Sequence, residues 1–251
     1  MSSAEDDLTK LRQELADLKA EYQEYAYLVS HDLSAPFRQI EGFARIIAKH
    51  NDANFDEKTL RYLNFVIDGA DNGKALLASL LKFSRLNTET QPYSEVECNL
   101  LIDEIRSEFS ALIIDTKAIF EVGELPIVWA DKAHIKIVFA ELIRNALIYH
   151  KQSMPPLVSI QAEELPHFWQ LHFVDNGIGI PAKLYQHVFK ILRRGVTNEE
   201  FPGSGMGLAL ADKVIKAHGG EISLKSEVGN GTKISFTIPK PSFEPSIKTT
   251  F

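Results

Sequence analysis

Cysteine is almost absent from this sequence of 251 residues, which contains only Cys98. A single thiol cannot form an internal disulfide, and no CxxC pair or Cys/His spacing typical of a metal site occurs. No run of 18 apolar residues is present, because Asp115 and Lys117 interrupt the apolar stretch 111–120. The N-terminus is acidic and polar, so no signal peptide is visible. These absences predict a reduced cytoplasmic protein with no membrane segment in this chain.

An excess of basic residues is also lacking. The chain has 27 Lys and Arg against 34 Asp and Glu, a formal net charge of −7. This balance predicts no nucleic-acid surface, which would require a basic patch or stripe. A GxxxxGK[ST] motif is absent, so a P-loop is excluded. The length allows one large or two moderate domains.

The first part of the chain carries a heptad pattern. Apolar residues recur at seven-residue spacing in two interleaved sets, Leu8, Leu15, Tyr22 and Val29, and Leu11, Leu18 and Tyr25. Three heptads with charges between them predict a coiled coil that runs into a longer helix. Pro36 should bend this helix without ending it, because helical spacing resumes at Ile40.

A second long helix is expected after a polar turn at 50–57. Its apolar side includes Leu60, Leu63, Ala70, Leu80 and Phe83. Two long helices with one apolar face each cannot cover those faces alone, and pairing with a second copy gives a four-helix bundle. We therefore expect a homodimer, and a monomer by light scattering would count against it.

The second part mixes helical and strand-like patterns after a hinge at 87–94. We expect helices over Leu100–Ile114, Asp131–Tyr149 and Met206–His218, and strands over Ala118–Val122, Leu157–Glu163, Phe168–Val174, Glu221–Ser226 and Thr232–Ile238. Such an order predicts one sheet covered by helices. The Gly- and Pro-rich segment 173–204 is typical of a lid, and residues 239–251 should form a loose tail.

A histidine lies on the outer face of the predicted coiled coil. His31 occupies a c position, so its ring should point outward, and Asp32 follows it directly. A carboxylate beside an imidazole can hold one ring N–H and leave the other nitrogen as a nucleophile. Most histidines on a solvated helix face are simply polar residues, so this position alone does not establish catalysis.

Polar residues share one face of the predicted helix 131–149. Glu141, Asn145 and Tyr149 lie four residues apart. Asn145 offers a neutral oxygen of the kind that a hard cation accepts. A merely solvated stripe is the alternative interpretation, although Leu142, Ile143, Ala146 and Leu147 already supply the apolar side of the helix.

Two glycine motifs flank the predicted lid. Asp175-Asn-Gly177-Ile-Gly179-Ile180-Pro181 follows a strand, and Gly203-Ser-Gly205-Met206-Gly207-Leu208 leads into a helix. The first is not a Rossmann fingerprint, because it lacks the third glycine and the helix start, and it is also good turn chemistry. The second would let backbone N–H groups approach an anion at a helix N-terminus, although a flexible loop explains it equally well.

Together and in this order, the motifs resemble those of the sensor histidine kinases of two-component signalling. The likeness covers roughly residues 15–240, and SHDLSAPFRQIEGFARII around His31 is closest to phytochrome-type kinases. The second domain resembles the GHKL ATPase superfamily. This implies an α-helical hairpin, forming a four-helix bundle on dimerisation, plus an α/β two-layer sandwich of the Bergerat type.

The resemblance also implies a division of the chain. It predicts a coiled-coil signalling helix at 1–28, a dimerisation and histidine phosphoacceptor domain at 29–90, a catalytic ATP-binding domain at 95–240 and a tail at 241–251. The implied activity is ATP-dependent autophosphorylation of His31, followed by transfer to an aspartate of a response regulator receiver domain on a separate chain. The signal would come from a sensor domain or sensor protein upstream.

Residue roles follow from the same resemblance. His31 is the implied phosphoacceptor and Asp32 its orienting base, while Asn145 and Glu141 are the implied Mg²⁺ site. Asp175 would accept the exocyclic amine of adenine, and Arg194 would contact the γ-phosphate, with Phe189 anchoring the lid. The remaining implied ATP-binding residues are Asn145, Tyr149, Lys151, Gly177, Gly179, Ile180, Gly203, Gly205, Met206, Gly207, Leu208 and Thr232.

Three positions depart from the family pattern. Ala35 replaces the Thr or Asn that orients water in kinases that also dephosphorylate their regulator, so we predict weak phosphatase activity. Glu141 replaces an Asn and is typical of the ATPase branches, where it activates water. Ile148 stands where a phosphate-contacting Lys is common, and Lys151 could substitute for it. A non-catalytic nucleotide-binding scaffold and a GHKL-type ATPase therefore stay open as alternatives.

Overall fold

The computed structural model of the chain describes residues 2–49, 55–86, 90–191 and 205–241. It divides into two compact units, Met1–Arg85 and Leu86–Phe251. The first is helical and the second contains every strand among the described residues. No helix in these ranges is long and apolar enough to cross a membrane.

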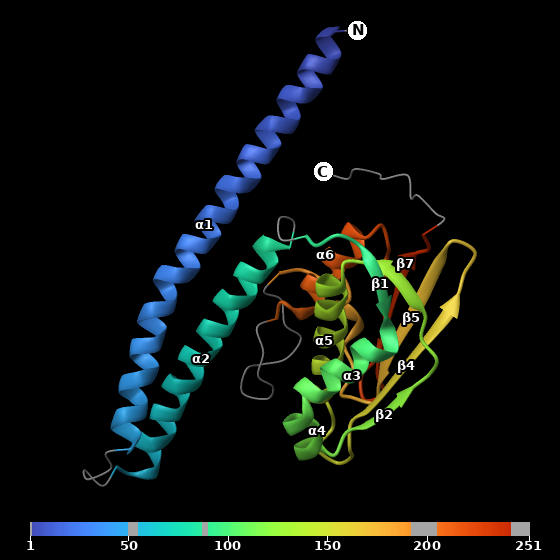
Figure 1. The fold of residues 1–251 in the computed structure, drawn as a ribbon. Coiled ribbons are helices and arrows are strands. Elements are labelled where there is room, and N and C mark those ends of the chain that lie inside the picture. The colour runs from blue at the N-terminus through green and yellow to red at the C-terminus, as the bar shows by residue number, and fades with distance from the viewer. Residues whose placement is uncertain (1, 50–54, 87–89, 192–204, 242–251) are drawn as a thin grey trace. The chain divides into compact units, whose positions relative to one another are not determined.

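The first unit is an antiparallel hairpin of two long helices, α1 (Ser2–Lys49) and α2 (Glu57–Arg85), which lie side by side (Figure 1). Helix α1 continues through Pro36, as the sequence predicts. Asp56 caps the N-terminus of α2, because its carboxylate accepts the Thr59 N–H at 2.8 Å. The predicted turn at 50–57 therefore extends too far by one residue at its C-terminal end, and its residues 50–54 lie outside the described part.

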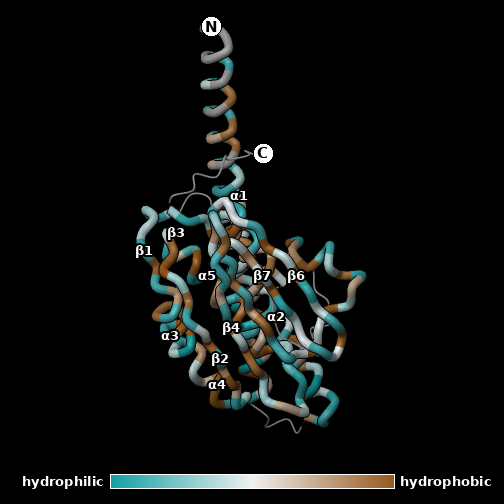
Figure 2. The backbone as a smooth tube through the Cα atoms, turned by 90° about the vertical axis from the view of Figure 1, so that its right-hand side faces the viewer, coloured by the Kyte–Doolittle hydropathy of each residue, from teal (hydrophilic) through white to brown (hydrophobic). Residues whose placement is uncertain are grey.

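Close packing and ion pairs hold the hairpin together. Gly73 gives room to the Phe37 ring, since a Cβ at Gly73 would lie 2.5 Å from it. Arg45 on α1 contacts Asp71 on α2 at 2.9 Å, and Lys74 pairs with both Asp71 and Glu41. Few large side chains are buried in this unit, and hydrophobic stretches alternate with hydrophilic ones along α1 (Figure 2).

The second unit is an α/β sandwich. Its sheet has the order β2-β4-β5-β7-β6, formed by β2 (Ile119–Val122), β4 (Leu157–Glu164), β5 (Phe168–Asp175), β6 (Ile222–Glu227) and β7 (Gly231–Pro239). Strands β2 and β4 are parallel and the other pairs antiparallel. Helices α5 (Lys132–Ile148) and α6 (Gly207–Ala217) pack together on one face of the sheet (Figure 1).

The core lies between this face and the two helices. Phe139 on α5 packs against Phe173 on β5 and Phe236 on β7, with ring centroids 5.2 and 6.1 Å apart. Leu171 and Ile160 complete the buried face of the sheet. Because side chains alternate along a strand, this packing fixes which end residues of β5 and β7 face the helices.

A small second sheet was not predicted. Strand β1 (Ser94–Glu97) pairs antiparallel with β3 (Ile127–Ala130). Each strand has four residues, which is too short for a recognisable alternation of apolar and polar residues. The predicted hinge at 87–94 is wrong at its C-terminal end, because Ser94 belongs to β1.

The helix predicted over Leu100–Ile114 is two helices. Helix α3 (Cys98–Glu108) ends at Phe109, whose backbone leaves the helical region at φ −94° and ψ 13°, and α4 (Ser110–Thr116) follows. Lys117 ends α4 in the left-handed conformation, with φ 55°. This residue turns the chain into β2, so the strand begins one residue later than predicted.

The other predicted elements are confirmed with small shifts at their ends. Asp131 precedes α5 and caps it, while Met206 and His218 cap α6. The predicted lid at 173–204 begins too early, because Phe173–Asp175 belong to β5, and a 3₁₀ turn η2 (Ala182–Leu184) lies within it. The predicted tail also begins too early, since Pro239 ends β7 and the Lys240 N–H donates to the His167 carbonyl at 2.9 Å.

Candidate functional site

His31 lies on the surface of the helical unit, as its heptad position predicts. Its side chain is 67% exposed, and its Nδ1 lies 3.1 Å from the Asp32 Oδ1. When Nδ1 carries the proton, this contact fixes the tautomer in which Nε2 keeps its lone pair. No hydrogen bond to Nε2 is found among the described residues.

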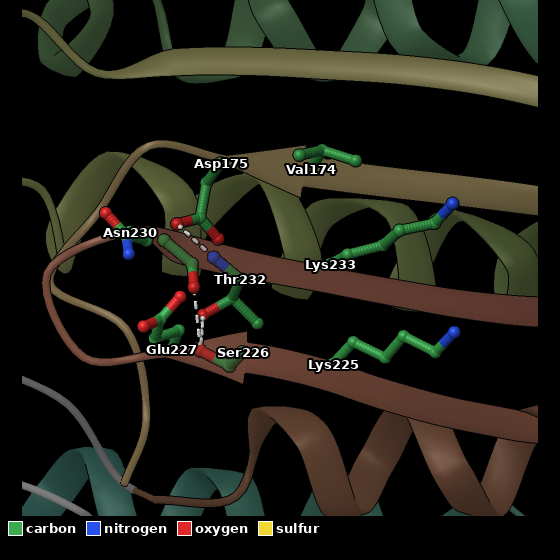
Figure 3. Close-up of a pocket in the computed structure, with 9 residues that line it drawn as sticks. Val174, Asp175, Lys225, Ser226, Glu227, Asn230, Thr232 and Lys233 are labelled. Atoms are coloured by element: carbon green, nitrogen blue, oxygen red, sulfur yellow. Dashed lines mark hydrogen bonds between the residues drawn. The ribbon is translucent and has the colours of Figure 1, made fainter.

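Polar side chains converge where β5 and β6 end and β7 begins. The register places Asp175 opposite Thr232, and Thr232 opposite Ser226. The Asp175 Oδ1 accepts the N–H of Gly177 at 2.8 Å and the N–H of Thr232 at 3.2 Å. Figure 3 shows these strand ends around a pocket of about 340 Å³, with Lys225 and Lys233 extending away from the carboxylate.

Burial changes the acidity of Asp175. It raises the pKa of this carboxyl to about 6, while the two backbone N–H groups act in the opposite direction. A carboxylate with one oxygen held by the main chain is a fixed acceptor for a ligand N–H. Asp175 is thus the described group of this pocket best suited to select a ligand by hydrogen bonding.

The loop after Asp175 requires glycine at two positions, 177 and 179. A Cβ at Gly177 would lie 2.4 Å from the Tyr149 carbonyl oxygen, and one at Gly179 would lie 2.0 Å from the Glu227 carbonyl oxygen. Gly179 also has φ 72°, which a side chain disfavours. The glycines therefore let the loop lie directly against the end of α5 and the β6–β7 turn.

Ser226 links this loop to the sheet and was not predicted. Its Oγ accepts the Ile180 N–H at 2.8 Å, donates to the Gly231 carbonyl at 2.7 Å and lies 2.9 Å from the Thr232 Oγ1. Tyr185 binds the Ser226 main chain through its hydroxyl group. A serine near a strand end has no sequence signal that distinguishes it from the other serines of the chain.

Helices α5 and α6 carry the residues that were predicted to bind a cation and an anion. Glu141 and Asn145 lie one turn apart on α5. A Cβ at Gly207 would lie 2.8 Å from the Glu141 Oε2, so this carboxylate lies against the first turn of α6. Gly205 has φ 67°, and Met206 is fully buried, so Met206 packs in the core of the second unit.

The remaining residues predicted to bind ATP lie on several different elements of the second unit. Tyr149 ends α5, and its carbonyl accepts the Ile178 N–H at 3.0 Å, while Lys151 lies in the turn before β4. Leu208 lies in the first turn of α6 and Phe189 in the turns after η2. Arg194 and Gly203 lie outside the described residues.

A second polar cluster holds the segment that precedes β1. The buried Asp131 accepts the Gln91 N–H at 2.6 Å and the His134 N–H at 3.2 Å, and its own N–H donates to the His218 Nε2 at 3.2 Å. Tyr93 stacks on His218 with centroids 5.0 Å apart. From Gln91 onward the predicted hinge at 87–94 is therefore held in place, because Gln91 and Tyr93 contact Asp131 and His218 of the same unit.

Burial lowers the pKa of His218, and His134 acts in the same direction. The Val214 carbonyl, which accepts the Nδ1 N–H at 2.8 Å, and Asp131 oppose this shift. The imidazole is thereby kept neutral, with Nε2 as the acceptor that the Asp131 N–H requires.

Comparison with known proteins defines the class of the second unit. Residues 130–242 match the family described as histidine kinase-, DNA gyrase B-, and HSP90-like ATPase. This range runs from the start of α5 to just beyond β7 and includes Asn145, Asp175 and Gly207. The second unit is an ATP-binding domain of this type.

Relatives extend the likeness to the helical unit. Cyanobacterial phytochrome A of Nostoc sp. strain PCC 7120 is 30% identical over 93% of this chain and 30% of its own length. Phytochrome-like protein Cph1 of Synechocystis sp. strain PCC 6803 is 28% identical over 93% and 31%. The chain thus spans about a third of the length of these curated relatives.

Two solved structures have a similar fold. The catalytic domain of histidine kinase ThkA aligns with 60% of this chain and 97% of its own, at 27% identity and a TM-score of 0.52. ThkA in complex with response regulator protein TrrA aligns with 86% of this chain and 61% of its own, at 25% identity and a TM-score of 0.59. The chain is a histidine kinase catalytic core, with its ATP-binding domain preceded by a helical hairpin.

Proposed function

We propose that this chain transfers the γ-phosphoryl group of ATP to its own His31 in the reducing cytoplasm. The observation that carries the proposal is the exposed imidazole whose Nδ1 lies 3.1 Å from Asp32. In this arrangement the Nε2 lone pair attacks the γ-phosphorus, the bond to the β–γ bridging oxygen breaks, and ADP leaves. The proton on Nδ1 stays hydrogen-bonded to Asp32, whose carboxylate stabilises the charge that develops on the ring.

Nucleotide selection is assigned to the strand ends. The fixed carboxylate of Asp175 is suited to accept the exocyclic amine of adenine, with Thr232 and Ile180 beside it. The glycines at 177 and 179 let the main chain approach the base, and Gly205 and Gly207 would let it approach the phosphates. Tyr149, Lys151 and Leu208 would border the same site, and Phe189 would anchor the lid, whereas the expected contacts Arg194 and Gly203 lie outside the described residues.

The described residues fit a magnesium ion held mainly by the nucleotide. No cluster of three or more His, Cys, Asp or Glu suited to a metal is found among them, whereas Mg²⁺ commonly binds one or two protein oxygens plus phosphates and water. Glu141 and Asn145 supply such oxygens on adjacent turns of α5. When bound, the ion would neutralise charge on the phosphates.

Partners follow from the exposed surfaces of the helical unit. Side chains at the heptad positions Leu11, Leu18, Tyr22 and Tyr25 are each more than half exposed in the single chain. A second copy would cover them, which favours a homodimer built around a four-helix bundle. ThkA has been solved with its response regulator TrrA, and we propose that this chain likewise passes its phosphoryl group to a receiver aspartate on a separate chain, under an upstream sensor.

The proposal is tested by His31→Gln. We expect labelling from γ-³²P-ATP to disappear while nucleotide affinity stays unchanged, because the nucleotide groups lie in the other unit. His167→Gln, at an exposed histidine of the second unit, is the matched control. The phosphate on the wild-type protein should be acid-labile and base-stable. Labelling that survives His31→Gln would refute the assignment, and no labelling of the wild type would favour a non-catalytic scaffold.

Glu141 gives a second candidate activity, slow ATP hydrolysis. Its carboxylate lies against the first turn of α6, where a water next to the phosphates could be deprotonated. Glu141→Gln keeps an oxygen that can bind the cation but removes the base, so it should then reduce phosphate release more strongly than His31 labelling. Equal phosphate release by wild type and Glu141→Gln would remove this activity.

Ala35 is the basis for proposing weak phosphatase activity. Its methyl group cannot orient a water molecule near the phosphorylated ring, as a Thr or Asn side chain could. We expect Ala35→Thr to accelerate dephosphorylation of the cognate regulator in the presence of ADP. Rapid dephosphorylation by the wild-type protein would contradict this interpretation.

A further inference from the structure

An aromatic ring lies next to the proposed phosphoacceptor. Tyr27 precedes His31 by one helical turn, and the two ring centroids lie 6.1 Å apart with an interplanar angle of 26°. The near-parallel arrangement favours an offset stack. Tyr27 occupies an f position of the heptad frame, the position farthest from the predicted coiled-coil seam, so the ring does not belong to that seam.

A cation from the other helix fixes this ring. Arg85 is the last residue of α2, and its guanidinium carbon lies 5.5 Å from the Tyr27 ring centroid. The Gln23 side chain donates to the Ser84 carbonyl at 3.4 Å, which ties the same end of α2 to α1. The contact between Arg85 and Tyr27 is a cation–π interaction of the kind that Arg makes with aromatic rings.

These contacts and Asp32 restrict the orientation of the His31 ring in two ways. Asp32 holds Nδ1 through a hydrogen bond, whereas Tyr27 contacts the ring itself. An exposed histidine would otherwise sample several rotamers, and most of them would turn Nε2 away from an approaching phosphoryl group. Transfer in line requires the reacting atoms at a defined distance and angle, and misplacement by about 1 Å can cost 10²-fold in rate.

We propose that Tyr27 and Arg85 are positioning residues for phosphoryl transfer: Tyr27 orients the His31 imidazole, and Arg85 acts through Tyr27. This proposal rests on His31 being the phosphoacceptor. It assigns the pair no contact with ATP, so it affects the rate of transfer and leaves nucleotide binding unchanged.

The test compares autophosphorylation kinetics of variants of the full chain. Tyr27→Ala should lower kcat about tenfold with an unchanged KM for ATP. Tyr27→Phe should retain the wild-type kcat, because the ring and not the hydroxyl makes the stack. Arg85→Gln should lower kcat by a smaller factor, and Arg85→Lys should restore part of it.

A double variant separates the two roles. Because Arg85 acts through Tyr27, adding Arg85→Gln to Tyr27→Ala should cause no further loss. Arg61→Gln is the matched control, since Arg61 lies 5.4 Å from the Phe65 ring in a similar pair elsewhere on α2. The His31 ring protons should shift in NMR spectra of Tyr27→Ala and stay in place in Arg61→Gln.

Several outcomes would overturn the proposal. They are a wild-type kcat for Tyr27→Ala, an equal loss for Tyr27→Phe, and a KM that rises as kcat falls. Circular dichroism and light scattering of each variant show whether fold and association are retained, and Tyr27→Leu keeps bulk without a ring if Tyr27→Ala unfolds. If the wild-type protein labels no histidine, the proposed function fails, whereas normal labelling with unaltered variant kinetics refutes the positioning role alone.

Discussion

The two units of this chain carry their functional groups in opposite environments. The hairpin buries mainly small side chains, such as Ala26, Ala44 and Ala70, and exposes His31 to solvent. The α/β unit buries large side chains, including Phe139 and Phe236, and holds Asp175 partly buried at the edge of this core. Under the proposed function, the exposed His31 would be accessible to a phosphoryl donor, whereas the partly buried Asp175 would be held in a fixed position to select a ligand.

The largest expected effect separates the units by function. Asp175→Asn should weaken ATP binding at least about 10²-fold, because the amide loses the charged acceptor and presents an NH₂ group near the N–H groups of Gly177 and Thr232. Isothermal titration calorimetry measures the change. The hairpin should be unaffected, and unchanged far-UV circular dichroism is the control.

The same residue predicts a pH dependence of binding. Burial raises the pKa of Asp175 to about 6, so the carboxylate is progressively protonated as pH falls through 6. ATP affinity should therefore fall over that range in the wild type and stay flatter in Asp175→Asn. An affinity that is constant between pH 5 and pH 7 would show that the charged carboxylate is not the acceptor.

Two glycines allow the packing of the units to be compared directly. Gly177→Ala should destabilise the α/β unit by about 1–3 kcal/mol, because the new Cβ meets the Tyr149 carbonyl oxygen. Gly42→Ala in α1 meets nothing within 4 Å and should stabilise the hairpin by about 0.5–1 kcal/mol. Thermal melts of both variants measure this, and a similar loss in each would mean that the units are packed alike.

A decrease in pH should destabilise the α/β unit, because it favours protonation of His218. Because the folded-state pKa of this imidazole is lowered by burial, the unfolded chain binds the proton more readily. The contribution of the neutral His218 ring to the free energy of unfolding is thus complete above the pKa of about 6.5 that a histidine has in the unfolded chain. This contribution decreases as pH falls below that pKa. Denaturant melts from pH 7 to pH 5 measure the loss, which His218→Gln should reduce. Equal pH dependence of both proteins would exclude His218 as the cause.

The smallest effect is expected at the ion pairs of the hairpin. Arg45→Gln removes exposed contacts with Glu41 and Asp71, and such pairs contribute little in high dielectric. The melting temperature should change only slightly at low salt and not at all at high salt. A large shift that persists in salt would show that the pair is shielded by a partner copy.

Elements with long periodic patterns were predictable. The two hairpin helices, α5 and the sheet strands carry enough alternating or helical residues to be found within one or two positions. The four-residue strands β1 and β3 do not, and the break at Phe109 follows no helix-breaking residue. The predicted hinge extended too far because a polar segment without periodicity looks the same whether it is free or bound, as Gln91 is to Asp131.

The sequence by itself determined the family resemblance, the exposed position of His31 and the need for glycine around Asp175, since these depend on residue identity and local spacing. Only the tertiary structure decided which groups meet: Ser226 with Ile180, Asp131 with Gln91, and Arg85 with Tyr27. The physical reason is that these contacts join residues 40 to 58 positions apart in the chain. No local pattern records them, because packing of the elements brings the residues together.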